Sequence, residues 1–512
     1  EPDLVIRNSR VLTMDSQCPT AQSVAVKGDR ITWVGSDHDS EGLISNNTQV
    51  INGYGRTLLP GFHDAHIHFL AYAASLHAVD CSPTAVSSIQ DIKQTIARRV
   101  GVTEADQWIR AVGYSDFDLR ENRHPTRWDL DEAAPNNPVR LNHRSGHACV
   151  LNSRALELVG ISGSTTEPQG STILRDLTSG VPNGVLLEMD EFLDGKIPPL
   201  TKTVLESNAE EASNRLAAVG ITSIQDATAS NSVARWEMFR TLKSDRRLTQ
   251  RTSFMIGVSH IFEFSKLGLN FGAGNRELKI GATKIMLTEP GGQLHPGVTE
   301  IREIVADLHQ RGFQVAIHAV NSDAVSAAAG AIKLATSQSA SRPANEVRHR
   351  IEHCSELPPD VLRRVIASGA VVVTQPGFIF SSGQRYAADI SIRNQQWLYR
   401  IGALQNARVG LGFGSDAPVI DPNPMFGIYS AVSRTSANGN HIAANEAVSL
   451  ADAIEAYTLG SAYAGHSESH LGMIKPGFLA DLVLLDRDIT AIEPSELSEV
   501  KASRTIIGGS EV

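Results

Sequence analysis

The residues of this sequence best suited to chemistry include two histidines, His66 and His68, in the segment LPGFHDAHIH. Side chains alternate between the two faces of a β-strand, so residues two apart point the same way. Imidazole is the commonest metal-binding side chain, and a same-face pair is a ready chelate. A polar strand end can also carry two histidines by chance, so the pair needs support from other residues.

Three more polar residues end apolar segments that are typical of buried strands. His318 ends VAIH, His353 ends RIEH, and Asp416 ends GFGSD. In α/β barrels the active site lies at the carboxyl ends of the strands. One such histidine is usually an ordinary polar residue, but four strand ends that together supply histidines and an aspartate favour a shared site. Imidazoles with a carboxylate suit Zn²⁺ or a similar divalent ion.

Lys284 lies inside the apolar segment ATKIML. A charged lysine in an apolar strand is costly, so burial would lower its pKa toward the neutral amine. A neutral amine can take up carbon dioxide, and the resulting carbamate is an anionic ligand able to bridge two metals. The alternative is a lysine that reaches solvent or an ion pair, and the spacing alone does not decide between them.

The middle of the chain alternates short apolar segments with helical patterns. The apolar segments include residues 220–224, 283–287, 313–317, 370–373 and 407–412. Helices are expected over 299–311 and, with a serine N-cap, from Ser449 to Tyr463. This alternation predicts a parallel sheet, either doubly wound or closed into a barrel. The segment from about 71 to 210 is too long for one βα unit and indicates a large insertion.

Both ends of the chain are rich in short β-branched segments. Residues 4–6, 23–26 and 30–34 begin the sequence, and residues 481–485 and 504–507 end it. The Gly28-Asp29 step between two of these segments is typical of a hairpin. We therefore expect one small sheet domain assembled from both termini.

Composition excludes several classes of protein. The 512 residues carry 46 Lys and Arg against 56 Asp and Glu, a net charge of −10 that argues against nucleic-acid or anionic-membrane surfaces. The four cysteines are far apart, which excludes a disulfide scaffold and a thiolate zinc cluster. We expect a cytoplasmic protein with a small-molecule substrate, without a nucleic-acid or membrane partner. No signal peptide is expected at the given start, although a removed leader stays open.

The sequence also resembles a known family over nearly its whole length. The segments that carry the resemblance are PGFHDAHIH from Pro60, SGH from Ser145, LNS from Leu151, GVLLE from Gly184, GITS from Gly220, RIEH from Arg350, QP from Gln375, GSDAP from Gly414 and GFLADL from Gly477. They are similar to the amidohydrolase superfamily of metal-dependent hydrolases. The narrower resemblance is to the branch of N-substituted formamide deformylase, amidohydrolase family 3.

The resemblance implies an α/β fold, a distorted (β/α)₈ TIM barrel with a small β-sandwich formed by both termini. The sandwich would comprise residues 1–57 and 470–512, and the barrel residues 58–469. The insertion at about 71–210 would cover the active site.

The resemblance further implies a two-metal centre. His66 and His68 would bind the more buried ion and His318 and His353 the second. Lys284, carboxylated on its side-chain nitrogen, would bridge them, and Asp416 would ligate the buried ion and handle the proton. Zinc is the expected metal, two per chain, with Mn, Co or Fe as alternatives.

Other residues are expected around the substrate. His147, Asn152 and Glu188 would face it from the insertion, according to the resemblance. Relatives often carry Asp-Gly shortly after the lysine, whereas this chain has the segment 288–292, TEPGG. Glu289 in that segment would be a ligand or a substrate contact.

The expected reaction is hydrolysis of a C–N bond in an amide, formamide, carbamate or cyclic amide. A metal-activated water would attack, Asp416 would move the proton, and His147 would donate to the oxyanion. His63 is expected either to orient an imidazole, together with Asp64, or to be a surface group. The alternatives are a mononuclear-metal deaminase of a heterocycle and a catalytically inactive scaffold on the same fold. We expect a homodimer or homotetramer.

Overall fold

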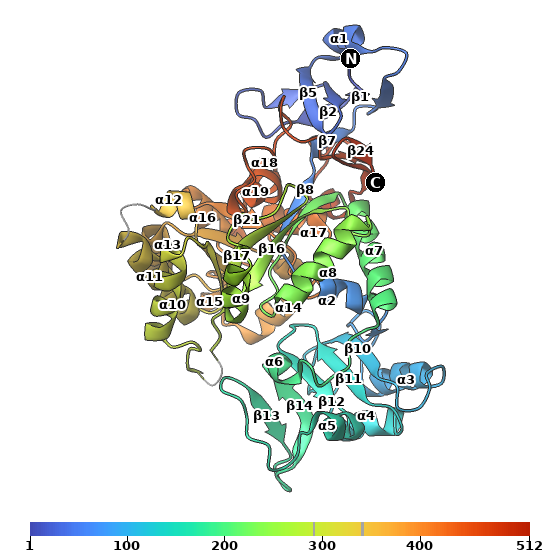
Figure 1. Ribbon diagram of the computed structural model, residues 1–512, viewed down its shortest axis with the longest axis vertical. Helices are drawn as coiled ribbons and strands as arrows, with labels where there is room; N and C mark the ends of the chain where they lie inside the picture. The colour runs from blue at the N-terminus through green and yellow to red at the C-terminus, as the bar shows by residue number, and fades with distance from the viewer. Residues whose placement is uncertain (290–291, 339–342) are drawn as a thin grey trace. The chain divides into compact units, whose positions relative to one another are not determined.

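The computed structural model describes residues 1–289, 292–338 and 343–512. The chain divides into two compact units (Figure 1). The first contains residues 1–69, 210–288 and 293–512, and the second contains residues 70–209 with Glu289 and Gly292. The domain boundaries given above, and the position of the insertion over the active site, stay predictions.

The first unit is built around an eight-stranded, all-parallel sheet whose strands are neighbours in the order β21-β20-β19-β18-β17-β16-β15-β8. In chain order the strands are β8 (Phe62–Ile67), β15 (Ile221–Asp226), β16 (Arg251–Gly257), β17 (Leu278–Met286), β18 (Val315–Ala319), β19 (Arg350–His353), β20 (Val371–Thr374) and β21 (Leu411–Phe413). Nearly every strand residue is buried, as expected for parallel strands covered on both faces.

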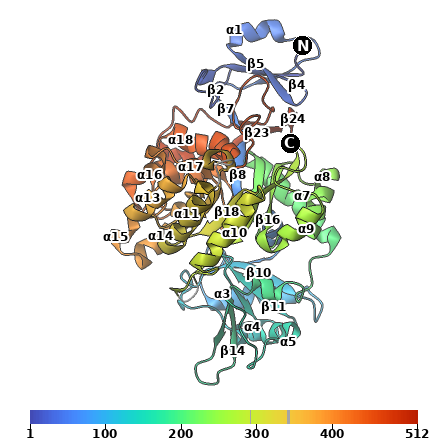
Figure 2. The same ribbon diagram turned by 60° about the vertical axis from the view of Figure 1, so that its left-hand side comes forward.

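Helices connect these strands and surround them (Figure 2). The longer ones are α7 (Lys202–Ala218), α8 (Val233–Ser244), α10 (Val298–Gln310), α11 (Ser322–Ser337), α13 (Pro359–Ser368), α14 (Gly377–Asp389) and α17 (Pro424–Ser433). The shorter ones include α2 (Phe69–Ser75), α9 (Ile261–Lys266), α16 (Ile401–Asn406), α18 (Leu450–Glu455) and α19 (Ser461–Ala464). The strand–helix alternation predicted from the sequence is confirmed as a distorted (β/α)₈ barrel.

The barrel closes between its first and last strands through backbone hydrogen bonds. Asp416 N donates to His66 O over 2.7 Å, and His68 N donates to Ala417 O over 2.9 Å. The Asp64 carboxylate accepts from Ser415 N over 2.9 Å and from the Ser415 hydroxyl. Closure therefore brings the residues after β21 directly against the histidine segment of β8.

Two further sheets of the first unit combine both ends of the chain. One has the order β5-β4-β1-β6, with β1 (Leu4–Arg7), β4 (Ser23–Lys27), β5 (Arg30–Gly35) and β6 (Gln49–Asn52). The other has the order β24-β23-β22-β7-β2-β3, with β2 (Arg10–Leu12), β3 (Thr20–Ala21), β7 (Thr57–Pro60), β22 (Leu482–Leu485), β23 (Ala502–Ile507) and β24 (Ser510–Glu511). Apolar side chains from both ends form one buried core, which confirms the predicted sheet domain.

The second unit has its own six-stranded sheet in the order β13-β14-β12-β11-β10-β9. Its strands are β9 (Val79–Asp80), β10 (Ile109–Tyr114), β11 (Val139–His143), β12 (Ala148–Leu151), β13 (Thr172–Arg175) and β14 (Pro182–Leu187), and its helices include α3 (Ile89–Val100), α4 (Arg127–Ala133) and α5 (Ser153–Val159). Two apolar clusters of this unit contain no residue of the barrel, so the unit has a core of its own.

The structure refines the two helices expected from spacing. The helix predicted over 299–311 is α10, shifted by one residue. The helix predicted from Ser449 begins as expected, because Ser449 accepts a hydrogen bond from Asp452 N. A π-helical turn over Ala456–Gly460 then separates α18 from α19. Within the described residues, no helix is long and apolar enough to cross a membrane.

Gly414 tests the closure of the barrel. A Cβ added there would lie 2.6 Å from the backbone nitrogen of His66 and 3.0 Å from Asp64 Oδ1. We expect Gly414→Ala to lower the free energy of unfolding by about 1–3 kcal/mol, because the backbones cannot separate without breaking the closing hydrogen bonds. The thermal unfolding midpoint measures the effect. Gly330→Ala in α11, where an added Cβ meets no atom within 4 Å, is the control and should not lower the midpoint.

Candidate metal centre

The carboxyl ends of the barrel strands bring the predicted ligands together. His66 is in β8 and His68 follows it, His318 is in β18, His353 ends β19, and Asp416 follows β21. Lys284 is close to the end of β17 and is 1% exposed. All six residues belong to the first unit.

Distances show a compact cluster centred on His66 and Asp416. Asp416 Oδ1 lies 3.0 Å from His68 Nε2 and 3.4 Å from His66 Nε2. Lys284 Nζ lies 3.3 Å from the same His66 Nε2 atom. Ring centroids are 4.7 Å apart for His66 and His353. The six predicted ligands thus include one set, His66, His68 and Asp416, whose ligand atoms all lie within 4.8 Å of one another.

His318 lies against His353 and so extends the cluster. The ring centroids of these two histidines are 4.5 Å apart, with the planes at 71°. Both imidazoles are buried. The pair therefore stands next to the first set, as a second position for a metal requires.

The Nδ1 atoms of three imidazoles are already engaged. His66 Nδ1 bonds to the Glu352 carboxylate, His68 Nδ1 lies 3.1 Å from the Thr228 hydroxyl, and His353 Nδ1 lies 2.9 Å from the Gln375 carbonyl oxygen. Partners of this kind fix the ring orientation and tautomer of metal-binding histidines. A histidine that donates from Nδ1 keeps the lone pair on Nε2 free for a metal.

Glu352 is a site residue that the sequence analysis missed. Arg350 holds it through Nε to Oε1 at 2.7 Å and Nη2 to Oε2 at 2.9 Å. Arg350 also donates to the backbone oxygen of Ala65 over 2.9 Å and to the Gln225 side chain. The only local signal was the position of Glu352 next to His353, because its partner His66 is 286 residues away in the sequence.

Two ligands have left-handed backbone conformations. His353 has φ 68° and Asp416 has φ 61°, a region that costs free energy for residues other than glycine. Hydrogen bonds hold both bends, from Asp416 N to His66 O and from Cys354 N to Ala319 O. The bend at the end of β19 also explains how Glu352 and His353, neighbours in a strand, both reach the cluster.

The surroundings set protonation states that suit a metal. Burial and the nearby Lys284 charge lower the pKa of His66, and burial lowers the pKa of His353. Burial alone would raise the pKa of Asp416, but the interaction with His68 and the nearby imidazoles of His66 and His353 lower it overall. Neutral imidazoles with an ionised carboxylate are the forms that bind divalent ions. The donor set therefore fits a divalent cation.

Asp64 and His63 have different positions. Asp64 Oδ1 accepts from His66 N over 3.1 Å as well as from Ser415, so it orients the ligands through their backbone. His63 is 3% exposed and lines a cavity near the amino-terminal ends of the strands. It is therefore neither a surface group nor a neighbour of the predicted ligands at the opposite strand ends.

The predicted substrate residues of the second unit fall into two groups. His147 Nδ1 and Glu188 Oε1 are 2.8 Å apart, and both side chains are partly exposed. Asn152 is fully buried, and its amide bonds to Val139 N, Ala155 N, Ala134 O and Asn137 O. This leaves no group of Asn152 for a substrate, so we correct its expected role to a structural one. Glu289 is half-buried, and residues 290 and 291 of the same segment lie outside the described residues.

Comparison with known proteins identifies the family. A model described as amidohydrolase family matches residues 49–512. The chain belongs to the amidohydrolase family. It is 30% identical over 542 residues to N-substituted formamide deformylase of Arthrobacter pascens, with 99% of this chain and 97% of the relative covered.

Solved structures of metal-dependent hydrolases agree on the fold. An uncharacterized metal-dependent hydrolase from Pyrococcus horikoshii OT3 matches with a TM-score of 0.76 at 22% identity, over 96% of this chain and 99% of that one. A second from Pyrococcus furiosus matches with a TM-score of 0.72 at 24% identity, over 95% and 99%. Family membership confirms the predicted class, a metal-dependent amidohydrolase acting on carbon–nitrogen bonds other than peptide bonds.

Thr228 tests whether the Nδ1 contacts matter for metal binding. Thr228→Val keeps the side-chain shape but removes the hydroxyl that orients His68. We expect about a 10-fold or greater loss of metal affinity, measured by competition with a chromophoric chelator. Thr374→Val is the matched control, because the Thr374 hydroxyl is buried without a hydrogen-bond partner in the described structure. Equal affinity in the two variants would contradict a role for Thr228.

Proposed function

We propose that this amidohydrolase cleaves the C–N bond of an amide, formamide, carbamate or cyclic amide with a two-metal centre. The observation that carries the proposal is the cluster of six side chains, in which three imidazoles are held at Nδ1 and so keep Nε2 for a metal. His66 and His68 would hold the more buried ion with Asp416, and His318 and His353 the second. Zinc is the proposed metal, with Mn, Co and Fe as alternatives.

Lys284 is proposed to carry the bridging carbamate. Its ammonium is buried beside His66, and burial lowers its pKa to about 8. Near neutral pH a fraction of the amine is neutral and can attack carbon dioxide. The amine loses a proton to solvent as the N–C bond forms, and the carbamate would be an anionic oxygen ligand beside His66.

The proton chemistry falls to Asp416. A divalent ion, when bound, lowers the pKa of water from 15.7 toward 7 and polarises a carbonyl oxygen. Because the pKa of Asp416 is lowered, its carboxylate is ionised at neutral pH. We propose that it accepts the proton of the attacking water and then delivers it to the leaving nitrogen.

His147 and Glu188 are proposed to contact the substrate. The contact of 2.8 Å between His147 Nδ1 and Glu188 Oε1 orients the His147 ring. We propose that His147 donates to the oxyanion of the tetrahedral intermediate, a contribution typically worth about 10²–10³ in rate. The part played by Glu289 stays a prediction, as do the homodimer or homotetramer and the cytoplasmic location.

A substrate screen tests the function directly. Because a relative at 30% identity bears the name N-substituted formamide deformylase, N-formyl amines are the first compounds to try, followed by N-acyl amines, carbamates and cyclic amides. The protein would be loaded separately with Zn²⁺, Mn²⁺ or Co²⁺, and release of amine and acid measured. Metal analysis separates the alternatives: two ions per chain support the proposal, one supports a mononuclear deaminase, and none supports an inactive scaffold.

Substitution of Asp416 tests the proposed proton transfer. We expect Asp416→Asn to keep bound metal, since an amide oxygen can still ligate, and to lose at least about 10²-fold in turnover. Metal analysis and the rate on the best substrate measure both effects. Asp421→Asn, an exposed aspartate five residues on, is the control. Full activity of Asp416→Asn would remove Asp416 from the mechanism.

Substitution of Lys284 tests whether its carbamate bridges the two metals. We expect Lys284→Ala to lose metal, because the carbamate oxygens disappear with the amine. Added short carboxylates such as acetate should restore part of the metal and of the activity by filling the space. An alanine variant that keeps two metals without any additive would show that Lys284 does not bridge them.

A further inference from the structure

The cavity lined by His63 lies at the opposite end of the barrel strands from the candidate metal centre. It has a volume of about 340 Å³ and is lined by the early residues of four strands. These include His63 of β8, Ser223 of β15, Arg251 of β16 and Lys279 of β17. The segment from His466 to Leu471 contributes the other wall. The cavity belongs entirely to the first unit.

The charge of the lining is positive. Three basic residues, Arg251, Arg276 and Lys279, line the cavity, whereas no carboxylate does so among the described residues. Burial lowers the pKa of Lys279 to about 8, so this amine stays mostly charged near neutral pH. Burial lowers the pKa of His470, and the further causes are all cations. Burial likewise lowers the pKa of His63 to about 3, with further lowering by His470, Arg251 and Lys279. These two histidines are therefore uncharged at neutral pH, and the positive charge that a ligand meets comes from Arg251, Arg276 and Lys279.

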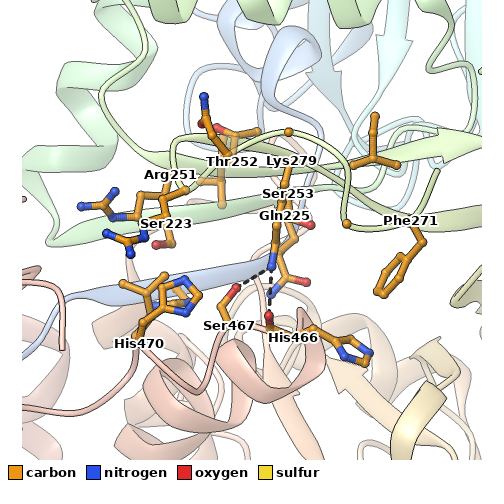
Figure 3. A pocket seen from close by; sticks show the side chains of 18 residues that line it. Ser223, Gln225, Arg251, Thr252, Ser253, Phe271, Lys279, His466, Ser467 and His470 are labelled. Atoms are coloured by element: carbon orange, nitrogen blue, oxygen red, sulfur yellow. Dashed lines mark hydrogen bonds between the residues drawn. The ribbon is translucent and has the colours of Figure 1, made fainter. Parts of the chain in front are cut away.

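Several of these cations already have hydrogen-bond or ion-pair partners, which limits the hydrogen bonds that each can donate to a ligand. Arg251 pairs with Asp481 over 2.7 Å and with Glu277. Lys279 uses its ammonium on Gly465 O, His466 O and the Ser467 hydroxyl, as Figure 3 shows in part. Lys279 thus contributes charge without a carboxylate partner at contact distance. Arg276 is half exposed and lies 3.8 Å from Asp29, so its guanidinium is free to turn.

Ser223 is the lining side chain whose hydroxyl most needs a hydrogen-bonding ligand. It is 5% exposed, and its hydroxyl has no hydrogen-bond partner in the described structure. It lies beside His63, its partner in the register of β15 and β8, and both line the cavity. A buried polar group without a partner costs free energy, which a hydrogen-bonding occupant would recover.

We propose that this cavity is a binding site for a small oxyanion, a phosphate or carboxylate group. The Ser223 hydroxyl and the Arg276 guanidinium donate hydrogen bonds to it, and Lys279 is a further cation on the lining. Its position at the amino-terminal ends of the strands separates it from the chemistry at the carboxyl ends. The oxyanion is therefore a ligand that stabilises the fold and is not the substrate.

The test measures binding to the metal-loaded full chain by calorimetry. The probes are inorganic phosphate and succinate at constant ionic strength, which distinguish a phosphate from a carboxylate source. We expect one site per chain for at least one probe, and a rise of the unfolding midpoint with its concentration. Ser223→Ala and Arg276→Gln should each weaken binding at least fivefold while leaving substrate turnover without probe unchanged.

Arg363→Gln is the matched control, because Arg363 lines a different surface hollow and its substitution removes the same charge as Arg276→Gln. Its affinity for the probe should stay within twofold of the unaltered protein. The proposal fails if neither probe binds below about 10 mM, or if all three variants bind equally. It also fails if the probe competes with substrate and its affinity is unchanged by Ser223→Ala and Arg276→Gln, because the probe then occupies the metal centre.

Discussion

The buried guanidinium of Arg350 is the interaction on which the candidate site depends. Arg350 is fully buried inside the barrel, and a charge in that position is tolerated only when its hydrogen bonds are satisfied. It achieves this by bonding to Glu352, Gln225 and the backbone oxygen of Ala65. These partners lie on three strands, β19, β15 and β8. One side chain thus ties β19 and β8, the strands of His353 and His66, to β15, and through Glu352 it sets the orientation of His66.

Part of this arrangement follows from sequence alone. His66 and His68 could be singled out by their spacing on one face of a strand. His318, His353 and Asp416 could be singled out because each ends an apolar segment, where parallel strands share one edge. The amphipathic spacing of α10 and the serine cap of α18 are local signals of the same kind. The small domain built from both ends could be expected because short β-branched segments have no other partner nearby.

Other features could not be predicted, because they depend on contacts between distant segments. Nothing near Glu352 indicates that its carboxylate meets His66, and nothing near Asp64 indicates Ser415. The left-handed bends at His353 and Asp416 depend on hydrogen bonds to residues far away in the sequence, Ala319 and His66. Asn152 was expected to contact substrate, whereas its side-chain amide makes all its hydrogen bonds to backbone groups of its own unit. The π-helical turn at Ala456–Gly460 likewise interrupts a helix whose sequence pattern is continuous.

The pairing of β7 with β22 has a consequence for biosynthesis. β7 leads directly into β8, the strand that carries His66, and its neighbour β22 lies more than 400 residues further along the sequence. Because chains emerge from the ribosome amino terminus first, β7 cannot form this pairing until Leu482–Leu485 have been synthesised. The strand that leads into the first predicted ligands is therefore completed on that side only after every barrel strand has been made.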